Sequence, residues 1–579
     1  MTQASSMPPS DAGEDSQPRA SDPGGKFIKH PLRWALAGFV VGTLAIAMIQ
    51  FNASVTDYQM AFLRSSVVGC LTLLWVGAFT QLALRRSGRR WWLPIGAVIG
   101  AIAAGSLIQI ETLSGEMIPQ WRWRFSSVTT PSLQTLDDAA LTRLDSVGDQ
   151  SIERQPASDG QFEAIASVDK QIGWSGFLGN QRDGVVAKRL FKVPTSKDQI
   201  ETRWNIGIGE GWSSFAVAQQ LAVTLEQRGD EECVTAYRLA DGQLVWTYCY
   251  PALHFHALGQ GGPRSTPAIA NDRVWTQGAT GRVCCLALST GELIWSVDLL
   301  ELVGWTQTAS EEAITWGRSG SPLLIDGLCV LPLGGPFDAK ESGRSLVALD
   351  ALTGEVRWRA GPDQISYASP QSMSLDGVDQ IVAVNEETIT GHDPVDGAIL
   401  WTFDWPGSST GGPNCATAVA AGPDQFLIGK GYGGGSALVR VTRDDGDWSA
   451  TARWDSNRML KTKFNHAVVR DGVAYGISNG ALQAVELESQ TIAWQQSRRD
   501  RCGQGQVILA EDQLIVQTEP GEILIVDANP EAYQLRCRID ALQHKTWNIP
   551  TLVGATLLVR NARQAIAFDL PLANSNGLD

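Results

Sequence analysis

Two short clusters in the middle of the chain hold residue types that can do chemistry. His254 and His256 are separated by one residue, so an extended backbone places both imidazoles on one face, where they could bind a metal ion. Two histidines without a nearby third ligand are more often part of a surface loop. The run 429–435 is rich in glycine, but no Gly-Lys-Ser/Thr opens a helix after it, as a phosphate-binding loop requires. This run is predicted to be a hairpin loop.

A third group of polar residues stands at the predicted starts of short strands. Its members are Arg264, Arg318, Lys463, Gln504 and Asn548. If these strands surround a common axis, the side chains form a polar, partly cationic funnel that could bind a ligand. The alternative is that they donate hydrogen bonds to backbone carbonyls and tie the ends of neighbouring sheets together.

The elements that must position these residues come from a repeat in which a tight turn is followed by tryptophan. In the clearest copies Gly stands four residues before Trp246, Trp295, Trp358 and Trp401, and weaker copies end at Trp204, Trp454 and Trp494. Successive copies are roughly forty to sixty residues apart and contain short apolar runs, which is typical of a radial β-repeat. The fold class is therefore all-β. The tryptophans, Trp295 and Trp358 among them, are predicted to be buried between adjacent sheets.

Counting the repeats predicts an eight-bladed β-propeller over residues 173–570. Complete units span about 212–250, 263–299, 317–361, 366–405, 413–456, 463–497 and 502–540. The last stretch, 547–570, lacks one strand, and the orphan strand 202–206 is predicted to complete that blade and close the ring. Closure removes two exposed sheet edges. A seven-bladed ring is the alternative if the divergent unit around Asp445 is not a blade.

The N-terminal fifth of the chain has a different composition. Residues 1–30 are predicted to be a disordered cytoplasmic tail. Three uncharged apolar stretches follow, at about 34–51, 65–84 and 91–110, each near the length of roughly twenty residues that crosses a bilayer. They predict a three-helix transmembrane anchor over residues 31–112; the alternative is three buried core helices. Residues 113–172 are expected to be a linker, helical in part near 133–144, and residues 571–579 a tail.

Basic residues give the anchor an orientation. Lys26, Lys29 and Arg33 precede the first span, and the cluster Arg85–Arg90 lies between the second and third. Because positively charged loops stay in the cytoplasm, the N-terminus is predicted inside and the propeller outside. The expected location is the bacterial inner membrane, with the propeller in the periplasm. The whole chain has 46 Lys and Arg against 61 Asp and Glu, a net charge of −15, so a nucleic-acid partner is not expected.

Three segments of the predicted propeller carry a family resemblance. The segment Trp174–Val185, the segment Gly261–Pro267 and the pair Lys545–Pro550 with Val559–Asn561 resemble corresponding motifs of bacterial PQQ-like propeller proteins of planctomycete type. The resemblance covers about residues 172–570, and a three-span anchor also occurs in such proteins. The wider superfamily includes quinoprotein alcohol dehydrogenases and BamB-type outer-membrane assembly scaffolds, so the repeat is specific for fold and unspecific for activity.

The cysteines bear on the choice between an enzyme and a scaffold. Quinoprotein dehydrogenases often hold a vicinal cysteine pair over the quinone, but Cys284 and Cys285 stand in mid-strand, where buried apolar residues are expected. Most cysteines after Cys70 are expected to be free and buried. No calcium-binding set, catalytic base or haem motif that this resemblance would require can be placed.

The favoured function is therefore a non-catalytic binding or assembly scaffold. It would be anchored in the membrane, bind a protein partner or small ligand on the propeller face, and carry no cofactor. The alternative is a dehydrogenase that uses PQQ with calcium and passes electrons to membrane quinone.

Overall fold

The computed structural model describes residues 108–116, 118–123, 130–135, 141–143 and 173–573, without 257, 337, 339–342 and 498. The predicted tail 1–30, the first two predicted spans and residues 91–107 of the third lie outside these residues. No helix within the described ranges has the length and apolar character that a membrane span needs.

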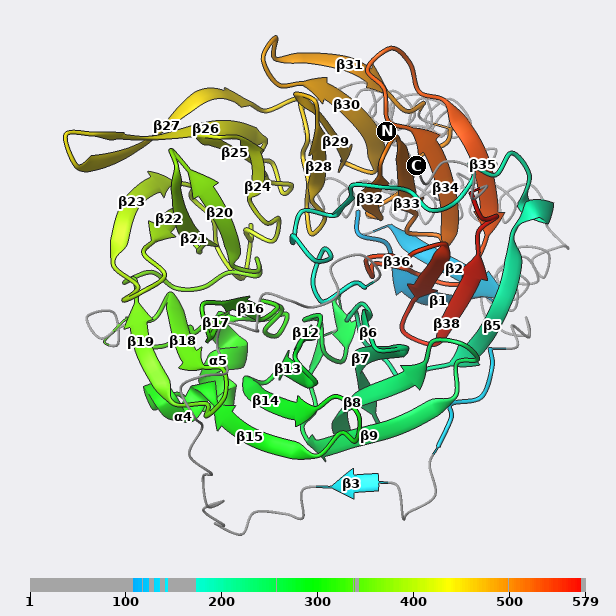
Figure 1. Ribbon diagram of the computed structural model, residues 1–579, viewed down its shortest axis with the longest axis horizontal. Helices are drawn as coiled ribbons and strands as arrows, with labels where there is room; N and C mark the ends of the chain where they lie inside the picture. Colours follow the sequence, from blue (N-terminus) through cyan, green and yellow to red (C-terminus); the bar gives the residue numbers. More distant parts are fainter. Residues whose placement is uncertain are drawn as a thin grey trace, which may run out of the picture. The chain divides into compact units, whose positions relative to one another are not determined.

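Eight sheets of antiparallel strands stand around a common centre, which confirms the predicted eight-bladed propeller (Figure 1). Blade 1 consists of β6 (Ala216–Ala218), β7 (Leu221–Arg228), β8 (Glu231–Arg238) and β9 (Leu244–Pro251). Blade 2 consists of β12 (Ala268–Ala270), β13 (Arg273–Gln277), β14 (Arg282–Ala287) and β15 (Leu293–Asp298), and blade 3 of β16 (Leu323–Ile325), β17 (Leu328–Pro332), β18 (Leu346–Asp350) and β19 (Val356–Ala360). Blade 4 consists of β20 (Gln371–Leu375), β21 (Val378–Val384), β22 (Thr388–His392) and β23 (Ile399–Asp404).

Blades 5 to 8 follow the same order from the centre outward. Blade 5 consists of β24 (Val419–Gly422), β25 (Gln425–Gly429), β26 (Ser436–Asp444) and β27 (Asp447–Ser456). Blade 6 consists of β28 (Ala467–Arg470), β29 (Val473–Ser478), β30 (Ala481–Glu486) and β31 (Thr491–Gln495), and blade 7 of β32 (Gln506–Ala510), β33 (Gln513–Gln517), β34 (Glu522–Asp527) and β35 (Leu535–Asp540). Blade 8 consists of β36 (Thr551–Val553), β37 (Thr556–Arg560), β38 (Gln564–Asp569) and β5 (Glu201–Gly207).

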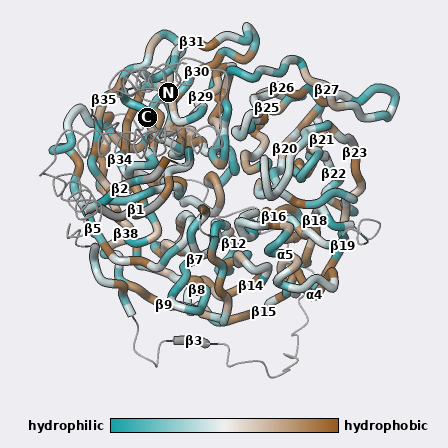
Figure 2. The backbone as a smooth tube through the Cα atoms, turned by 180° about the vertical axis from the view of Figure 1, so that it is seen from behind, coloured by the Kyte–Doolittle hydropathy of each residue, from teal (hydrophilic) through white to brown (hydrophobic). Residues whose placement is uncertain are grey.

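The ring closes where the sequence predicts. Strand β5, which comes early in the domain, is the outer strand of blade 8 and pairs antiparallel with β38, with Trp204 opposite Ala567. The divergent unit around Asp445 is a true blade whose β26–β27 hairpin extends beyond the ring. The tip of that hairpin is hydrophilic, whereas hydrophobic residues are concentrated in the blade strands (Figure 2).

The repeated Gly and Trp have a joint role that links consecutive blades. The turn glycine of one blade lies against the tryptophan of the blade before it. Gly291 has a φ of +76°, and a Cβ built on it would lie 2.5 Å from the Trp246 ring. The Nε1 of Trp246 donates to the carbonyl oxygen of Leu288 at 2.8 Å, at the start of the same turn. Gly therefore satisfies both the turn conformation and the space that the neighbouring ring requires.

The same contact recurs around the first half of the ring. It joins Gly242 to Trp204, Gly354 to Trp295 and Gly397 to Trp358. Trp295 and Trp358 are 7% and 9% exposed, which confirms that these rings are buried between blades. Each such contact removes a large apolar surface from water and fixes the spacing of adjacent sheets.

The segment before the propeller differs from the expected linker. Residues 108–110, the predicted end of the third span, belong to β1 (Ile108–Leu113), which pairs with β2 (Pro119–Trp123) in a separate two-stranded sheet. Residues 108–111 at the start of β1 alternate apolar and polar side chains, which is the period of a strand rather than of a membrane helix.

Part of the expected linker helix is also extended. Leu133 forms a bridge with Gly207, and β3 (Leu141–Arg143) pairs parallel with β9. The outer edge of blade 1 offers unpaired backbone groups, and this pairing satisfies them. The remaining elements are the short strands β4 (Val185–Val186), β10 (Phe255–His256) and β11 (Gln260–Gly261), the helices α4 (Leu299–Val303) and α5 (Gln307–Ala313), and the 3-10 helix η3 (Lys197–Gln199).

One cysteine pair was not predicted. Cys233 on β8 and Cys249 on β9 are register partners and form a disulfide. Six other cysteines in the described chain are free, and all of these except Cys415 are buried, as expected. Cys284 and Cys285 lie within β14 and are fully buried, and burial raises the pKa of each thiol to about 12.

Candidate functional site

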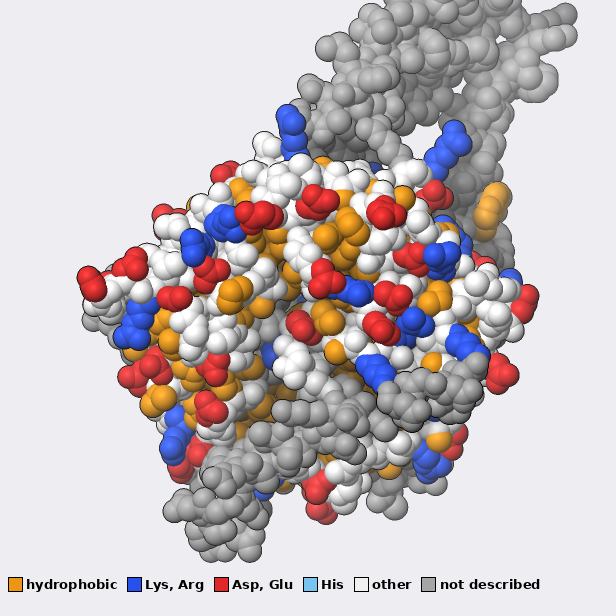
Figure 3. Space-filling model, turned by 45° about the horizontal axis from the view of Figure 1, so that its top comes forward, with side chains coloured by type: hydrophobic (Ala, Val, Ile, Leu, Met, Phe, Trp, Pro, Cys, Tyr) orange, Lys and Arg blue, Asp and Glu red, His pale blue; other side chains and the backbone are white. Residues whose placement is uncertain are grey.

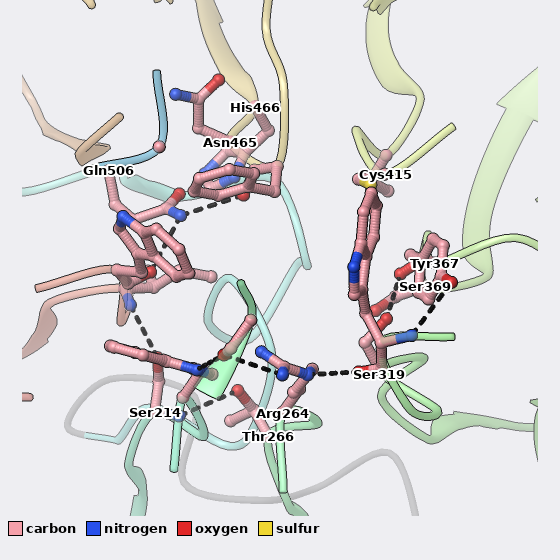
Figure 4. A pocket seen from close by; sticks show the side chains of 18 of the residues that line it. Ser214, Arg264, Thr266, Ser319, Tyr367, Ser369, Cys415, Asn465, His466 and Gln506 are labelled. Carbon is pink, nitrogen blue, oxygen red and sulfur yellow. Dashed lines mark hydrogen bonds between the residues drawn. The ribbon is translucent and has the colours of Figure 1, made fainter. Parts of the chain in front are cut away.

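A cavity of about 270 Å³ lies where the blades converge. Many of its walls come from the loops that lead into the inner strands, so the starts of the blades position much of the site. Figure 4 shows labelled side chains from several blades pointing toward this space, with Arg264 between two groups of walls. The lining includes seven aromatic residues: Phe177, Trp212, Trp316, Tyr367, Tyr432, Phe464 and Trp547.

The aromatic residues form two clusters. In the first, Trp316 lies 5.3 Å from Tyr367 and 6.2 Å from Tyr432 between ring centroids. In the second, Trp547 lies 4.8 Å from Trp212 and 4.7 Å from Phe464. Aromatic rings held by one another in this way are rigid and present flat apolar faces at low entropic cost. The cavity is therefore suited to a ligand with a planar apolar part.

Arg264 provides the charge of the cavity. Its Nη2 donates to the carbonyl oxygens of Gly259 at 2.9 Å and Gln260 at 3.1 Å, and its Nε donates to the carbonyl of Trp316. These acceptors are neutral, and within the described chain no carboxylate forms an ion pair with Arg264. Burial lowers the pKa of this guanidinium to about 10, so it remains charged at neutral pH.

Acidic groups are absent from the described residues that line the cavity. His466, which also lines it, is neutral at pH 7 because burial lowers its pKa to about 4. Two acceptor atoms of the lining, Oδ1 of Asn465 and Oε1 of Gln506, are buried and have no partner within the described structure. The described lining thus combines one formal positive charge with no acidic group.

Arg264 is the predicted funnel residue that lines the cavity; the structure places the others elsewhere. Arg318 is 1% exposed and donates to the carbonyl oxygen of Leu333, which belongs to the same blade, blade 3. Asn548 donates to the carbonyl oxygen of Ser213 at 2.8 Å, which joins blade 8 to blade 1. Asn548 therefore ties two blades together, as the alternative expects, whereas the Arg318 side chain binds a carbonyl of its own blade.

Lys463 and Gln504 lie at one mouth of the cavity, outside its lining. Lys463 Nζ donates to the carbonyl oxygen of Gly115 at 3.2 Å, and the backbone N–H of Gln504 donates to Glu519 at 3.0 Å. Ligand binding by the five predicted residues stays a prediction, with Arg264 in the position that best supports it.

The aromatic walls were not identified from the sequence. A signal was present: Trp212, Tyr367, Phe464 and Trp547 each stand a few residues before an inner strand, at related places in four blades. The sequence prediction named only the polar residues at these strand starts, and so it missed the aromatic residues beside them.

The other sequence candidates do not form a chemical site. His254 is 3% exposed and packs against Gly317. Burial and the nearby charge of Arg264 together lower the pKa of His254 to about 4. No group of three metal-ligating side chains occurs in the described ranges. The run 430–435 joins β25 to β26, which confirms a hairpin loop, and it supplies Tyr432 to the cavity.

Comparison with known proteins gives the family. A family model described as outer membrane protein assembly factor BamB matches residues 230–496 and 385–536. The chain belongs to this family. BamB of Yersinia pestis is 25% identical over 314 residues, which are 51% of this chain and 71% of that relative.

Two solved structures are similar to parts of this chain. BamB of Moraxella catarrhalis is 14% identical, with a TM-score of 0.44 over 64% of this chain and all of that chain. The quinohemoprotein alcohol dehydrogenase of Comamonas testosteroni is 12% identical, with a TM-score of 0.48 over 72% of this chain and 84% of that chain.

The residues of the cavity do not fit PQQ with calcium. Calcium requires several oxygen ligands, usually including carboxylates, and the described lining has none of these acids. The vicinal cysteines are buried inside blade 2 and are not part of the lining. A calcium-bound quinone therefore has neither a cation cradle nor a neighbouring disulfide in this cavity.

Proposed function

We propose that this protein is a non-catalytic binding scaffold, anchored in the inner membrane, whose propeller binds a protein partner outside the cytoplasm. Family membership supports a role in assembly, since the Yersinia relative is named an outer membrane protein assembly factor. The three apolar stretches and their flanking basic residues support the anchor and its orientation.

A rim of exposed apolar side chains beside the cavity carries the proposal. Phe255 is 67% exposed and Leu253 is 49% exposed, both in or next to the β10–β11 hairpin, and Ile118 on the β1–β2 hairpin is 52% exposed. Both hairpins border the cavity, because Gly259 and Gly115 line it. Large exposed apolar side chains on two segments that border one cavity favour an interaction site there.

The surface charge is compatible with a protein partner. On the face shown in Figure 3, acidic and basic side chains are interspersed with apolar ones instead of forming a basic field. A mixed surface with apolar anchors resembles a non-obligate protein interface, whereas nucleic acid would require a continuous positive stripe.

The proposal can be tested by site-specific photo-crosslinking in living cells. A photoreactive phenylalanine analogue at Phe255 of the full chain is expected to give a discrete adduct with one extracytoplasmic protein, identified by mass spectrometry. The same analogue at Val395, which is 83% exposed on the β22–β23 turn, is the matched control and should give none. No adduct at Phe255, or the same products at both sites, would contradict a partner at this rim.

A further inference from the structure

The turn of the β1–β2 hairpin covers one mouth of the central cavity. Ser114 and Gly115 are part of the cavity lining. The backbone N–H of Gly115 donates to Glu519 at 2.5 Å, and Lys545 donates to the carbonyl oxygen of Leu113 at 3.3 Å. Glu116 forms an ion pair with Arg501 at 3.2 Å. With the bond from Lys463, polar groups of blades 6 to 8 hold this turn over the opening.

A different segment closes the opposite end. Residues 173–186 cross the centre of the ring, where Phe177 lines the cavity (Figure 1). Arg182 donates to the carbonyl oxygens of Pro322 and Pro370, and Val185 pairs with Leu509. The turn of the β1–β2 hairpin contacts Gln504, which precedes β32, the inner strand of blade 7. The segment 173–186 instead pairs with the far end of β32, at Leu509. The two segments therefore lie on opposite sides of the cavity along the ring axis.

The two closures are attached very differently. Residues 185–186 form strand β4 and extend the sheet of blade 7, so that segment is part of the propeller. The hairpin forms a two-stranded sheet of its own and pairs with no blade. Displacing the turn breaks the side-chain hydrogen bonds and the ion pair described above, and because no blade sheet includes β1 or β2, it leaves the strand pairing of the blades intact.

The interior that the turn covers has a definite ligand preference. Its two aromatic clusters offer flat faces, Arg264 offers an unbalanced positive charge, and the described lining offers no acid. A buried charge without a counter-ion is costly, and a ligand anion would relieve that cost. The positive charge of Arg264 disfavours a cationic ligand, while the aromatic faces favour a ligand that contains an aromatic ring.

We infer that the central cavity is a binding site for a small aromatic anion, such as an aromatic carboxylate, and that the turn Ser114–Glu116 is a removable plug that controls entry. Arg264 binds the anionic group, and the clusters around Trp316 and Trp547 contact the ring. This inference does not depend on a protein partner at the rim, so each can fail without the other.

Gly115 gives a direct way to displace the plug. A Cβ at this position would lie 2.5 Å from Cγ and 2.7 Å from Cβ of Gln504, and 2.9 Å from the Phe464 ring. Gly115→Ala therefore prevents the turn from seating in the mouth. Gly412→Ala is the matched control, because it lies in another loop beside the cavity and a Cβ there meets nothing within 4 Å.

The test uses the full chain in lipid nanodiscs and 2-naphthoate as the probe, with neutral 2-naphthalenemethanol for comparison. Calorimetry should show at least tenfold tighter binding of the anion, and Arg264→Gln should abolish that preference. Stopped-flow quenching of tryptophan fluorescence should show at least tenfold faster entry of naphthoate into Gly115→Ala and an unchanged rate in Gly412→Ala. Empty nanodiscs correct for partition into lipid.

Hydrogen exchange provides a second readout that does not require a ligand. Amides of residues 108–116 should lose protection in Gly115→Ala but keep it in Gly412→Ala, while the blade strands keep theirs in both. Equal affinity for the anion and the alcohol, or no binding to the unplugged variant, would overturn the assigned ligand class. Equal entry rates in all variants would overturn the plug.

Discussion

The Gly291–Trp246 contact shows how single residues set the spacing of the blades. Gly291→Ala adds a methyl group 2.5 Å from the Trp246 ring and keeps a φ of +76° that alanine disfavours. Strain and overpacking together should destabilise the fold by about 2–4 kcal/mol. Gly377→Ala has nearly the same φ, +77°, but its Cβ meets nothing within 4 Å, so it should cost about 1–2 kcal/mol. Urea unfolding of both variants measures the difference; equal midpoints would show that the ring contact does not matter.

His466 predicts a pH dependence of stability at the same scale. Burial lowers its pKa from about 6.5 to about 4. Between these values the unfolded chain binds a proton that the folded chain does not, so stability is full above pH 6.5 and falls as the pH drops toward 4. His466→Gln should reduce the acid loss by roughly 1–3 kcal/mol relative to the native chain. Melting temperatures measured from pH 7 to 4 check this, and parallel curves for both proteins would argue against a neutral His466.

At the scale of elements, ring closure depends on β5. Deleting residues 173–207 removes β5 and the segment that crosses the ring, and exposes the edge of β38. An unpaired edge is a template for association with another chain. We expect the truncated protein to aggregate or to melt at a markedly lower temperature, measured by light scattering and calorimetry. A monomer with the native melting temperature would show that the ring does not need this closure.

The sequence predicted the blades well because their information is local. Turn glycines, short apolar runs and tryptophans recur within each unit, so each sheet could be placed without knowledge of the others. The closure by β5 was predictable because the stretch 547–570 held one strand too few for a blade, while the strand 202–206 belonged to no other blade. The pairing of β1 with β2 and of β3 with β9 was missed, because the start of β1 was assigned to the apolar third span and β3 to a partly helical linker. The partners of such short strands are set by tertiary contacts.

The site was less predictable than the fold for a physical reason. The start of an inner strand fixes where a residue stands but not where a long side chain extends. Arg264 and Arg318 occupy similar places in consecutive blades, yet the first borders the cavity and the second donates to the carbonyl oxygen of Leu333 within its own blade. The disulfide between Cys233 and Cys249 likewise required the register of β8 and β9, which spacing alone does not give.

At the scale of the whole molecule, the orientation in the membrane is the main untested prediction. The cluster Arg85–Arg90 is expected on the cytoplasmic side, and all residues after Ile110 outside. A phosphatase reporter that is active only outside the cytoplasm should be active when fused after residue 126 and silent when fused at Ser87. The reverse pattern would invert the placement of the propeller.

The central claim is that the propeller binds without catalysis, and one measurement tests it most directly. The purified full chain is titrated with PQQ and calcium while tryptophan fluorescence and dye-linked oxidation of alcohols and sugars are followed. Because the described cavity lining has no carboxylate for calcium and no cysteine pair, we predict no calcium-dependent PQQ binding and no turnover. Tight calcium-dependent binding accompanied by substrate oxidation would contradict the account.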